Sequence, residues 1–380
     1  MSADQDTYLA RVRENPEDGG VFIYQGKDIT SLLIKDPSSL SEEEVKQLRE
    51  CYSVYGRNFF YKVATEYKII PFVAHILITL ECDIPYWEEE HDLFVKRNTL
   101  LIELLERIFD SVSKFSCHSL TLTENLGAVL ASDSCVGCFC SGDIDLSADI
   151  NEINEIISLM KSFNFKAKEQ PTSIGEYSGQ SMQFFNPEIT EKGFWINVIW
   201  KPVTRAFLIQ DRYELRLSKD RLDAPKKDNS HIRILEDTSL LYFCALHISA
   251  GHYFTLNPGL RLYVDIDRIV RNCAIDWDEL KKWEIEDKAG IRISLVLYLS
   301  KRLLDTPVPA TFFEHLYKHK RNRRLIDYLY DNNKNTIQAK SSLLRRLYIE
   351  LLSDNKVLLV NLIYRSIQLI ISKIPFFRSF

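Results

Sequence analysis

The chain has 380 residues, a length that predicts two or three domains. Hydrophobic residues make up 46% and charged residues 27%, values that exclude a disordered, collagen-like or low-complexity protein. The net charge of −5 is uneven: residues 311–380 carry 13 Lys and Arg against 5 Asp and Glu, a net of +8, so the remainder carries −13. The sequence therefore predicts an acidic body followed by a basic tail.

The N-terminus and the cysteines bear on the cellular compartment. The first 20 residues are polar and have no apolar segment of the signal-peptide type, so we expect reduced thiols and a cytoplasmic protein. The most apolar stretch, 357–371, is interrupted by Asn361, Arg365 and Gln368, and it lacks the ~18–20 continuous apolar residues of a membrane span. We therefore expect no transmembrane segment.

Hydrophobic periodicity divides the chain into successive parts. Apolar residues at three-to-four spacing predict helices on both sides of a central stretch, where shorter runs, more glycine and β-favouring residues predict strands. We therefore predict an α+β protein with a small mixed sheet flanked by helical regions. The expected parts are a loosely packed polar lead-in at 1–40, a helical N-terminal region at 41–117, the mixed-sheet domain at 118–235, a helical domain at 236–310 and a basic helical tail at 311–380.

Several residues mark where the helices begin. Ser41 followed by Glu44 is a capping box at the start of the N-terminal helical region. Pro71 and Pro85 interrupt that region, and Asp276 is placed to cap a later helix. The remaining elements that we expect near the middle of the chain are strands at 142–147, 180–185 and 194–200, the last two antiparallel, and a helix at 151–163.

The most informative motif is a pair of acids at spacing two. On a strand, Asp143 and Asp145 project from the same face while Ile144 and Leu146 point to the other. A divalent cation relieves the repulsion between two such carboxylates, and Mg²⁺ prefers carboxylate oxygen. Gly142 leaves room for a phosphate beside the backbone. The pattern predicts a metal–triphosphate site, although Asp-X-Asp alone more often marks a solvated pair in a turn.

The surrounding sequence resembles a known family. A glycine-containing helix, Asn125–Leu130, precedes the acidic strand, and a helix follows directly after it, as in the nucleotidyltransferase superfamily with its DNA-polymerase-beta-like palm. Three later segments are similar to the helical half of the "uncharacterised nucleotidyltransferase" family, and Arg97-Asn98 also fits. The resemblance covers roughly 40–309. The three later segments are Leu246–His252, Leu262–Ile269 and Ile275–Leu280.

The resemblance implies a function and a set of site residues. It implies that 118–235 is a nucleotidyltransferase palm that transfers a nucleoside monophosphate from an NTP, with Mg²⁺ or Mn²⁺ bound by Asp143 and Asp145. The acceptor is left open among a small molecule, a peptide, a protein and RNA. The other residues that we expect to contact the nucleotide are Gly127, Ser141, Gly142, Asn197, Lys201, His247 and Asp265.

The chain also departs from the family pattern. Leu126 stands where a lysine is common, and 138–141 lacks an arginine that often precedes the acids. Asn197 stands where a third metal-binding acid is expected, and an amide brings no negative charge. Either residues downstream substitute, or the chain is a catalytically degenerate relative that binds a nucleotide or a partner. The candidate substitutes are Lys201, Arg205 and Asp211.

Closely spaced cysteines suggest a second, weaker kind of site. Cys135, Cys138 and Cys140 with His118 offer zinc ligands, but structural zinc usually requires a second, well-spaced pair, and the sequence has no second CxxC. We therefore expect three ordinary thiols in this segment.

The histidines at 247 and 252 are five residues apart on an expected helix at 240–249. Regular helical geometry places them too far around to share a ligand, unless the turn at 249–251 is irregular. We expect His252 to be a hydrogen-bonded structural residue, while His247 matches the family's cleft.

The basic tail permits three roles. The cluster at 318–324, with tyrosines around it, has the composition of an RNA-backbone contact. The apolar face of 357–377 would suit the surface of an anionic membrane. Alternatively, the tail packs on the acidic body and its positive charge complements the −13.

Overall fold

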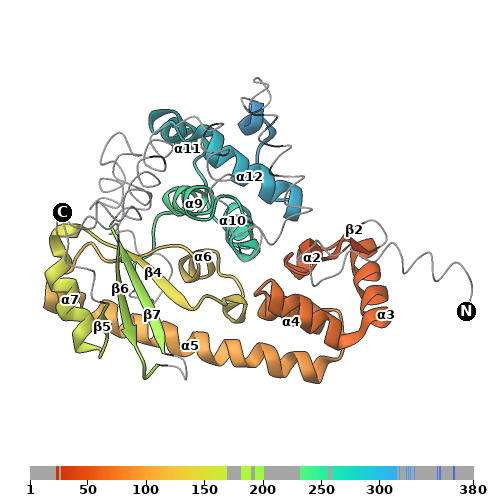
Figure 1. Cartoon of the computed structure of the whole chain (residues 1–380), viewed down its shortest axis with the longest axis horizontal. Helices are drawn as coiled ribbons and strands as arrows, with labels where there is room; N and C mark the ends of the chain where they lie inside the picture. Colours follow the sequence, from red (N-terminus) through yellow and green to blue (C-terminus); the bar gives the residue numbers. More distant parts are fainter. Residues whose placement is uncertain are drawn as a thin grey trace, which may run out of the picture.

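The computed structural model describes residues 23–24, 27–168, 181–189, 193–200, 232–255 and 259–314, with a few single residues between 316 and 363. These residues form one five-stranded mixed sheet with helices around it (Figure 1). The predicted α+β class, a small mixed sheet flanked by helical regions, is confirmed.

The N-terminal helices begin where the sequence predicted. Ser41 accepts from the Glu44 backbone while the Glu44 carboxylate accepts from the Ser41 backbone, which completes the capping box. Pro71 and Pro85 each lie in the first turn of a helix, where the missing N–H has no helical partner to lose. The three helices are α3 (Glu42–Glu66), α4 (Ile70–Thr79) and α5 (Ile84–Phe115).

The sheet has the order β3-β4-β7-β6-β5, with β4 and β7 parallel and every other pair antiparallel. In β4, Ile144 and Leu146 are fully buried against α5 and the helix that follows β4, α7 (Ile153–Ser162). Asp143 and Asp145, at the alternate positions of the strand, therefore leave the opposite face. The strands are β3 (Thr121–Leu122), β4 (Asp143–Ser147), β5 (Lys166–Ala167), β6 (Ser181–Asn186) and β7 (Phe194–Ile199).

A second group of helices lies on the other side of the sheet from α7 (Figure 1). Asp276 accepts from two backbone N–H groups at the start of one of them and so caps it as predicted. The group contains α6 (Leu126–Ala131), α9 (Asp237–Leu246), α10 (Leu260–Asn272), α11 (Trp277–Glu286) and α12 (Gly290–Leu304). Short 3₁₀ segments include η3 (Val136–Cys138) and η6 (Ala310–Phe313).

The described residues bury two hydrophobic cores. The sheet core joins the second half of α5 to the sheet and α7, with Leu105 and Phe184 at its centre. The helical core joins α3 and α4 to α9–α12, with Phe60 and Phe243 fully buried. In Figure 1, α5 runs along the lower edge beneath both the sheet and α4, so one helix supports both cores.

Part of the lead-in belongs to the helical core. Ile29 and Leu33 are buried around a short helix, α2 (Ile29–Leu32), and a strand pair precedes it, β1 (Ile23–Tyr24) with β2 (Lys27–Asp28). The expectation of loose packing is wrong here, because four consecutive apolar or small residues are fully covered by the helices that follow.

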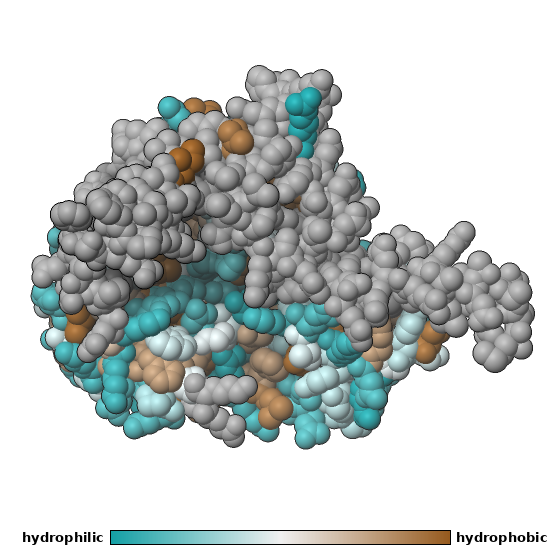
Figure 2. Space-filling view, in the orientation of Figure 1, coloured by the Kyte–Doolittle hydropathy of each residue, from teal (hydrophilic) through white to brown (hydrophobic). Residues whose placement is uncertain are grey.

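The visible surface over α5 and α7 is mostly hydrophilic, with apolar residues scattered singly (Figure 2). On α5, the side chains of Leu93 and Leu100 are more than half exposed. Across the described part of the chain, every helix is too short or too polar to traverse a lipid bilayer. Most of the basic tail lies outside the described residues, so its RNA, membrane and packing roles stay predictions.

Candidate functional site

Asp143 and Asp145 both turn toward Asn197 on the neighbouring strand. The parallel register pairs Asp145 with Asn197 directly. The Asn197 Nδ2 group donates to Asp143 Oδ2 at 2.8 Å and to Asp145 Oδ1 at 2.9 Å. One amide therefore lies between the two carboxylates, which share one side of β4. Gln183 on β6 donates to Asn197 Oδ1 at 3.1 Å and holds the amide in this orientation.

The loop before β4 is fixed from α5. Arg97 donates to the backbone carbonyl of Ser141, and the Ser141 hydroxyl donates to Asp143 Oδ1 at 2.6 Å. Asn98, fully buried, donates to the carbonyls of Val136 and Phe139. These contacts explain why Arg97-Asn98 accompanies the acidic strand in the sequence: α5 positions the segment that leads to the acids.

Gly142 occupies a different environment from its neighbours. A Cβ placed on it would meet no atom within 4 Å, so the backbone beside Asp143 faces open space. A Cβ on Gly127 would touch Leu122 at 3.5 Å, an ordinary contact. The Gly127 N–H donates to the Glu124 carbonyl at 3.1 Å, in the turn that starts α6.

A third carboxylate, which the sequence reasoning did not single out, lies close to the pair. Glu124 is 2% exposed, and its neighbour Asn125 donates to Asp145 Oδ2 at 3.0 Å. Burial and then the negative charges of Glu124 and Asp143 raise the pKa of Asp145 to about 7. The only local signal for Glu124 is its position immediately before the Asn125–Gly127 turn.

His247 pairs with Glu124 at the end of α9. Its Nδ1 lies 3.0 Å from Glu124 Oε1. Burial opposes the charged imidazole, but the carboxylates of Glu124, Asp145 and Asp143 together raise the pKa of His247 to about 9. His247 is therefore a cation at neutral pH, held among the carboxylates of Glu124, Asp143 and Asp145.

The chain after His247 forms a π turn, η5 (His247–Gly251), rather than the continued α-helix expected to residue 249. The His252 N–H donates to the His247 carbonyl at 3.1 Å, and the two Nε2 atoms lie 2.7 Å apart. Burial and the charge of His247 lower the pKa of His252 to about 4, so His252 accepts while His247 donates. The irregular turn thus brings the two rings together, and His252 is hydrogen-bonded as expected.

Asp265 on α10 lies among arginines. It is 6% exposed, and Arg268 lies 3.6 Å from its Oδ1. Burial raises its pKa to about 7, against the opposing charges of Arg268 and Arg261. Arg261 is half-buried, and its charge opposes the rise that burial causes in the pKa of the Cys140 thiol, in the loop before the acids.

The structure gathers most of the predicted site residues around the first three residues of β4. Asp143, Asp145 and Asn197 are in direct contact, and Ser141 contacts the first of these acids. His247 interacts with the pair through charge. Lys201, Arg205 and Asp211, the candidate substitutes, lie outside the described residues, as does any contact that they make.

The model of the family described as "Uncharacterised nucleotidyltransferase" matches residues 57–305, about two thirds of the chain. The chain belongs to this family. The matched range begins in α3 and ends just after α12, so it contains the sheet core, most of the helical core, the acidic strand and the His247 turn. No curated protein and no solved structure matches the chain.

Membership of the uncharacterised nucleotidyltransferase family supports nucleotide binding and transfer at the level of the family. Family membership does not specify the metal, the nucleotide or the acceptor.

Proposed function

We propose that the chain transfers a nucleoside monophosphate from an NTP to an acceptor, with Mg²⁺ or Mn²⁺ bound by Asp143 and Asp145. One observation carries the proposal. Both carboxylates lie on one side of β4 and are directed at a single amide, next to a glycine that faces open space. This arrangement occurs in a member of a nucleotidyltransferase family.

The donor atoms suit a hard divalent cation. Carboxylate oxygens are the ligands that Mg²⁺ prefers, and an amide oxygen is a further acceptable donor. Without a cation, the Asn197 Nδ2 group supplies the positive end of a dipole between the two acids. A bound cation would supply charge neutralisation for the triphosphate and the leaving pyrophosphate. Asn197 and Gln183 would keep the carboxylates on one side, which is a positioning role.

Cations from the helices replace those missing near β4. We assign Arg261 and His247 to the phosphate side, because Arg261 reaches the loop before the acids and His247 carries a positive charge beside them. Gly142 leaves the backbone open to a phosphate oxygen. Ser141, Gly127 and Asp265 lie on the neighbouring loop and helices. Positioning and charge neutralisation are the main means of catalysis in phosphoryl transfer.

The proposal is tested by thermal unfolding of the full chain with each NTP, with and without Mg²⁺. We expect a metal-dependent rise in the unfolding temperature with at least one NTP. The rise should disappear in Asp143→Asn and Asp145→Asn. Asp92→Asn, the same substitution on the exposed surface of α5, is the matched control and should keep the wild-type response.

Product analysis separates the enzyme from its rival, a degenerate relative that only binds. Pyrophosphate release from the NTP that stabilises the chain, dependent on Asp143, supports transfer. Stabilisation without pyrophosphate release under any acceptor mixture supports the binding protein. A chain that responds to no NTP with either metal contradicts the transferase and favours a degenerate relative that binds a partner instead of a nucleotide.

A further inference from the structure

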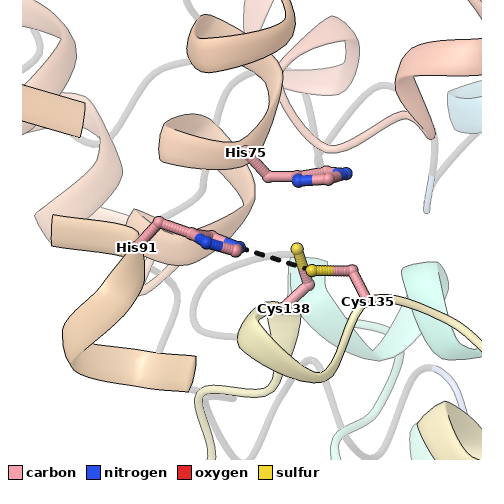
Figure 3. Close-up of side chains that lie close together, drawn as sticks. All are labelled: His75, His91, Cys135 and Cys138. Atoms are coloured by element: carbon pink, nitrogen blue, oxygen red, sulfur yellow. Dashed lines mark hydrogen bonds between the residues drawn. The ribbon is translucent and has the colours of Figure 1, made fainter. Parts of the chain in front are cut away.

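A second cluster of possible ligands lies on the N-terminal side of the acidic strand. It consists of His75 from α4, His91 from α5, Cys135 just before η3 and Cys138 at its end. One donor atom from each of the four residues lies within 4.8 Å of all the others. Figure 3 shows the two imidazoles one above the other, with both sulfur atoms directed at them.

The donor set and its spacing suit one metal in particular. Two thiols and two imidazoles are the ligands of structural zinc, at about 2.3 Å for sulfur and 2.0–2.1 Å for nitrogen in a tetrahedron. That geometry places the donors roughly 3.3–3.8 Å from one another. Cys135 Sγ and His91 Nε2 are already 3.3 Å apart. Because the other donor atoms lie within 4.8 Å of one another, small side-chain rotations bring all four to these distances.

The segment that carries the cysteines is built to receive His91. A Cβ on Gly137 would lie 2.4 Å from His91 Nε2, so the imidazole approaches the backbone where only glycine leaves space. The Cys138 N–H donates to the Cys135 carbonyl at 3.0 Å, and the buried Asn98 amide donates to carbonyls on both sides of Cys138. The turn is thus fixed before any ion binds.

The imidazoles are also fixed in place. The rings of His75 and His91 are stacked, with centroids 5.4 Å apart and an interplanar angle of 24°. They come from two helices that pack closely against each other, α4 and α5. A crevice beside the cluster is lined by His75, Cys135 and Cys138 together with Ser134 and Arg268, and it gives an ion a path of entry.

We propose that His75, His91, Cys135 and Cys138 bind a structural zinc ion, which joins α4 and α5 to the loop that leads into β4. This site differs from the set weighed from the sequence. Cys140 does not belong to it, because its Sγ contacts the carbonyl of Lys68. His118 does not belong to it either. The proposal does not depend on nucleotide transfer, since all its ligands lie outside the Asp143 site.

The first test is the metal content of the full chain, purified in reductant and measured by inductively coupled plasma mass spectrometry. We expect about one zinc per chain, as in closed four-ligand sites. Cys135→Ser, Cys138→Ser, His75→Asn and His91→Asn should each lower the content at least tenfold. Cys140→Ser and His118→Asn should keep the wild-type content, and Cys82→Ser is the matched control for loss of a remote, half-buried thiol.

A second measurement holds even where a ligand variant fails to fold. The wild-type chain, stripped with a chelator in reductant, is titrated with Co²⁺. We expect the visible bands of tetrahedral cobalt and a thiolate-to-cobalt charge-transfer band, with displacement of Co²⁺ by Zn²⁺. Absence of these bands, or zinc content equal in the wild type and in Cys135→Ser/Cys138→Ser, overturns the proposal. A loss of zinc in Cys140→Ser and His118→Asn as large as in the four ligand variants would also overturn the ligand set.

Asp143→Asn separates this proposal from the proposed function. The variant should lose the NTP response and keep its zinc, because no ligand of the cluster contacts Asp143. Loss of zinc in Asp143→Asn would contradict a structural site that is independent of the acids.

Discussion

The acidic site and the Cys/His cluster occupy two ends of one short segment, yet they are assembled differently. Asp143 and Asp145 come from three consecutive residues of a single strand, and the β period alone places them side by side. The four members of the cluster come from two helices and a 3₁₀ turn, spread over residues 75–138. A pair of acids placed by local periodicity can therefore be predicted from one sequence, whereas a cluster assembled by packing cannot.

The largest expected effect separates the two sites through their glycines. Gly137→Val should destabilise the chain by about 3 kcal/mol, because the new side chain would overlap His91 and Val95. Gly142→Ala, on the side of the acids, should change stability by less than about 0.5 kcal/mol, because nothing lies near its Cβ. Chemical denaturation of both variants measures the difference, and equal losses would contradict the comparison.

A smaller effect should reach both sites at once. Asn98→Ala leaves the carbonyls of Val136 and Phe139 without their buried donor, at a cost of about 2–3 kcal/mol. The same variant should weaken the NTP-induced thermal shift, because the loop to β4 loses an anchor. Thr99→Ala, at the next and exposed position of α5, is the control. A normal NTP shift in destabilised Asn98→Ala would mean that the loop is positioned from elsewhere.

The acidic side should also carry a pH dependence. The pKa of His247 is raised from 6.5 to about 9, so its contribution to stability is complete below pH 6.5 and is lost as pH rises toward 9. His247→Gln should remove this fall, which we expect to be on the order of 1–2 kcal/mol because the imidazole is partly exposed and solvent weakens its charge interactions. Denaturation at pH 6, 7.5 and 9 measures it, with His118→Gln as control. An unchanged pH slope in His247→Gln would contradict the ion pair with Glu124.

The smallest effect concerns Asn197. Asn197→Asp places a third carboxylate where an amide now donates to two, so metal-free stability should fall by about 1 kcal/mol. Mg²⁺ should then stabilise this variant more than it stabilises the wild type. Thermal shift against Mg²⁺ alone checks both statements. A variant that binds Mg²⁺ no better would mean that Asn197 does not occupy the position of a metal ligand.

The elements that could be predicted from the sequence are those that local contacts determine. The capping box at Ser41 and the Asp276 cap specify helix starts through contacts within four residues. Pro71 and Pro85, predicted as interruptions, lie in the first turns of α4 and α5. Strand pairing of β6 with β7 followed from two nearby β-rich runs. These elements were predicted to within a few residues.

The parts of the two sites that could not be predicted from the sequence depend on packing between distant segments. Glu124 lies beside the acids because β3 pairs with β4, and α9 brings His247 to it across 122 intervening positions. His75 and His91 join two cysteines only because α4 packs on α5 and both meet η3. The π turn after His247 has no pattern of its own, since Ser249–Gly251 is also compatible with an ordinary helix end.

The helical core has a consequence for synthesis on the ribosome. Its early half, including α3 and α4, leaves the exit tunnel long before α9–α12 exist, yet Phe60 packs in the same core as Phe243. Because these helices pack against α9–α12, part of their apolar surface stays uncovered while the roughly 160 residues between Thr79 and Asp237 are synthesised. Nascent chains arrested before residue 237 should therefore be the form that holding chaperones recognise.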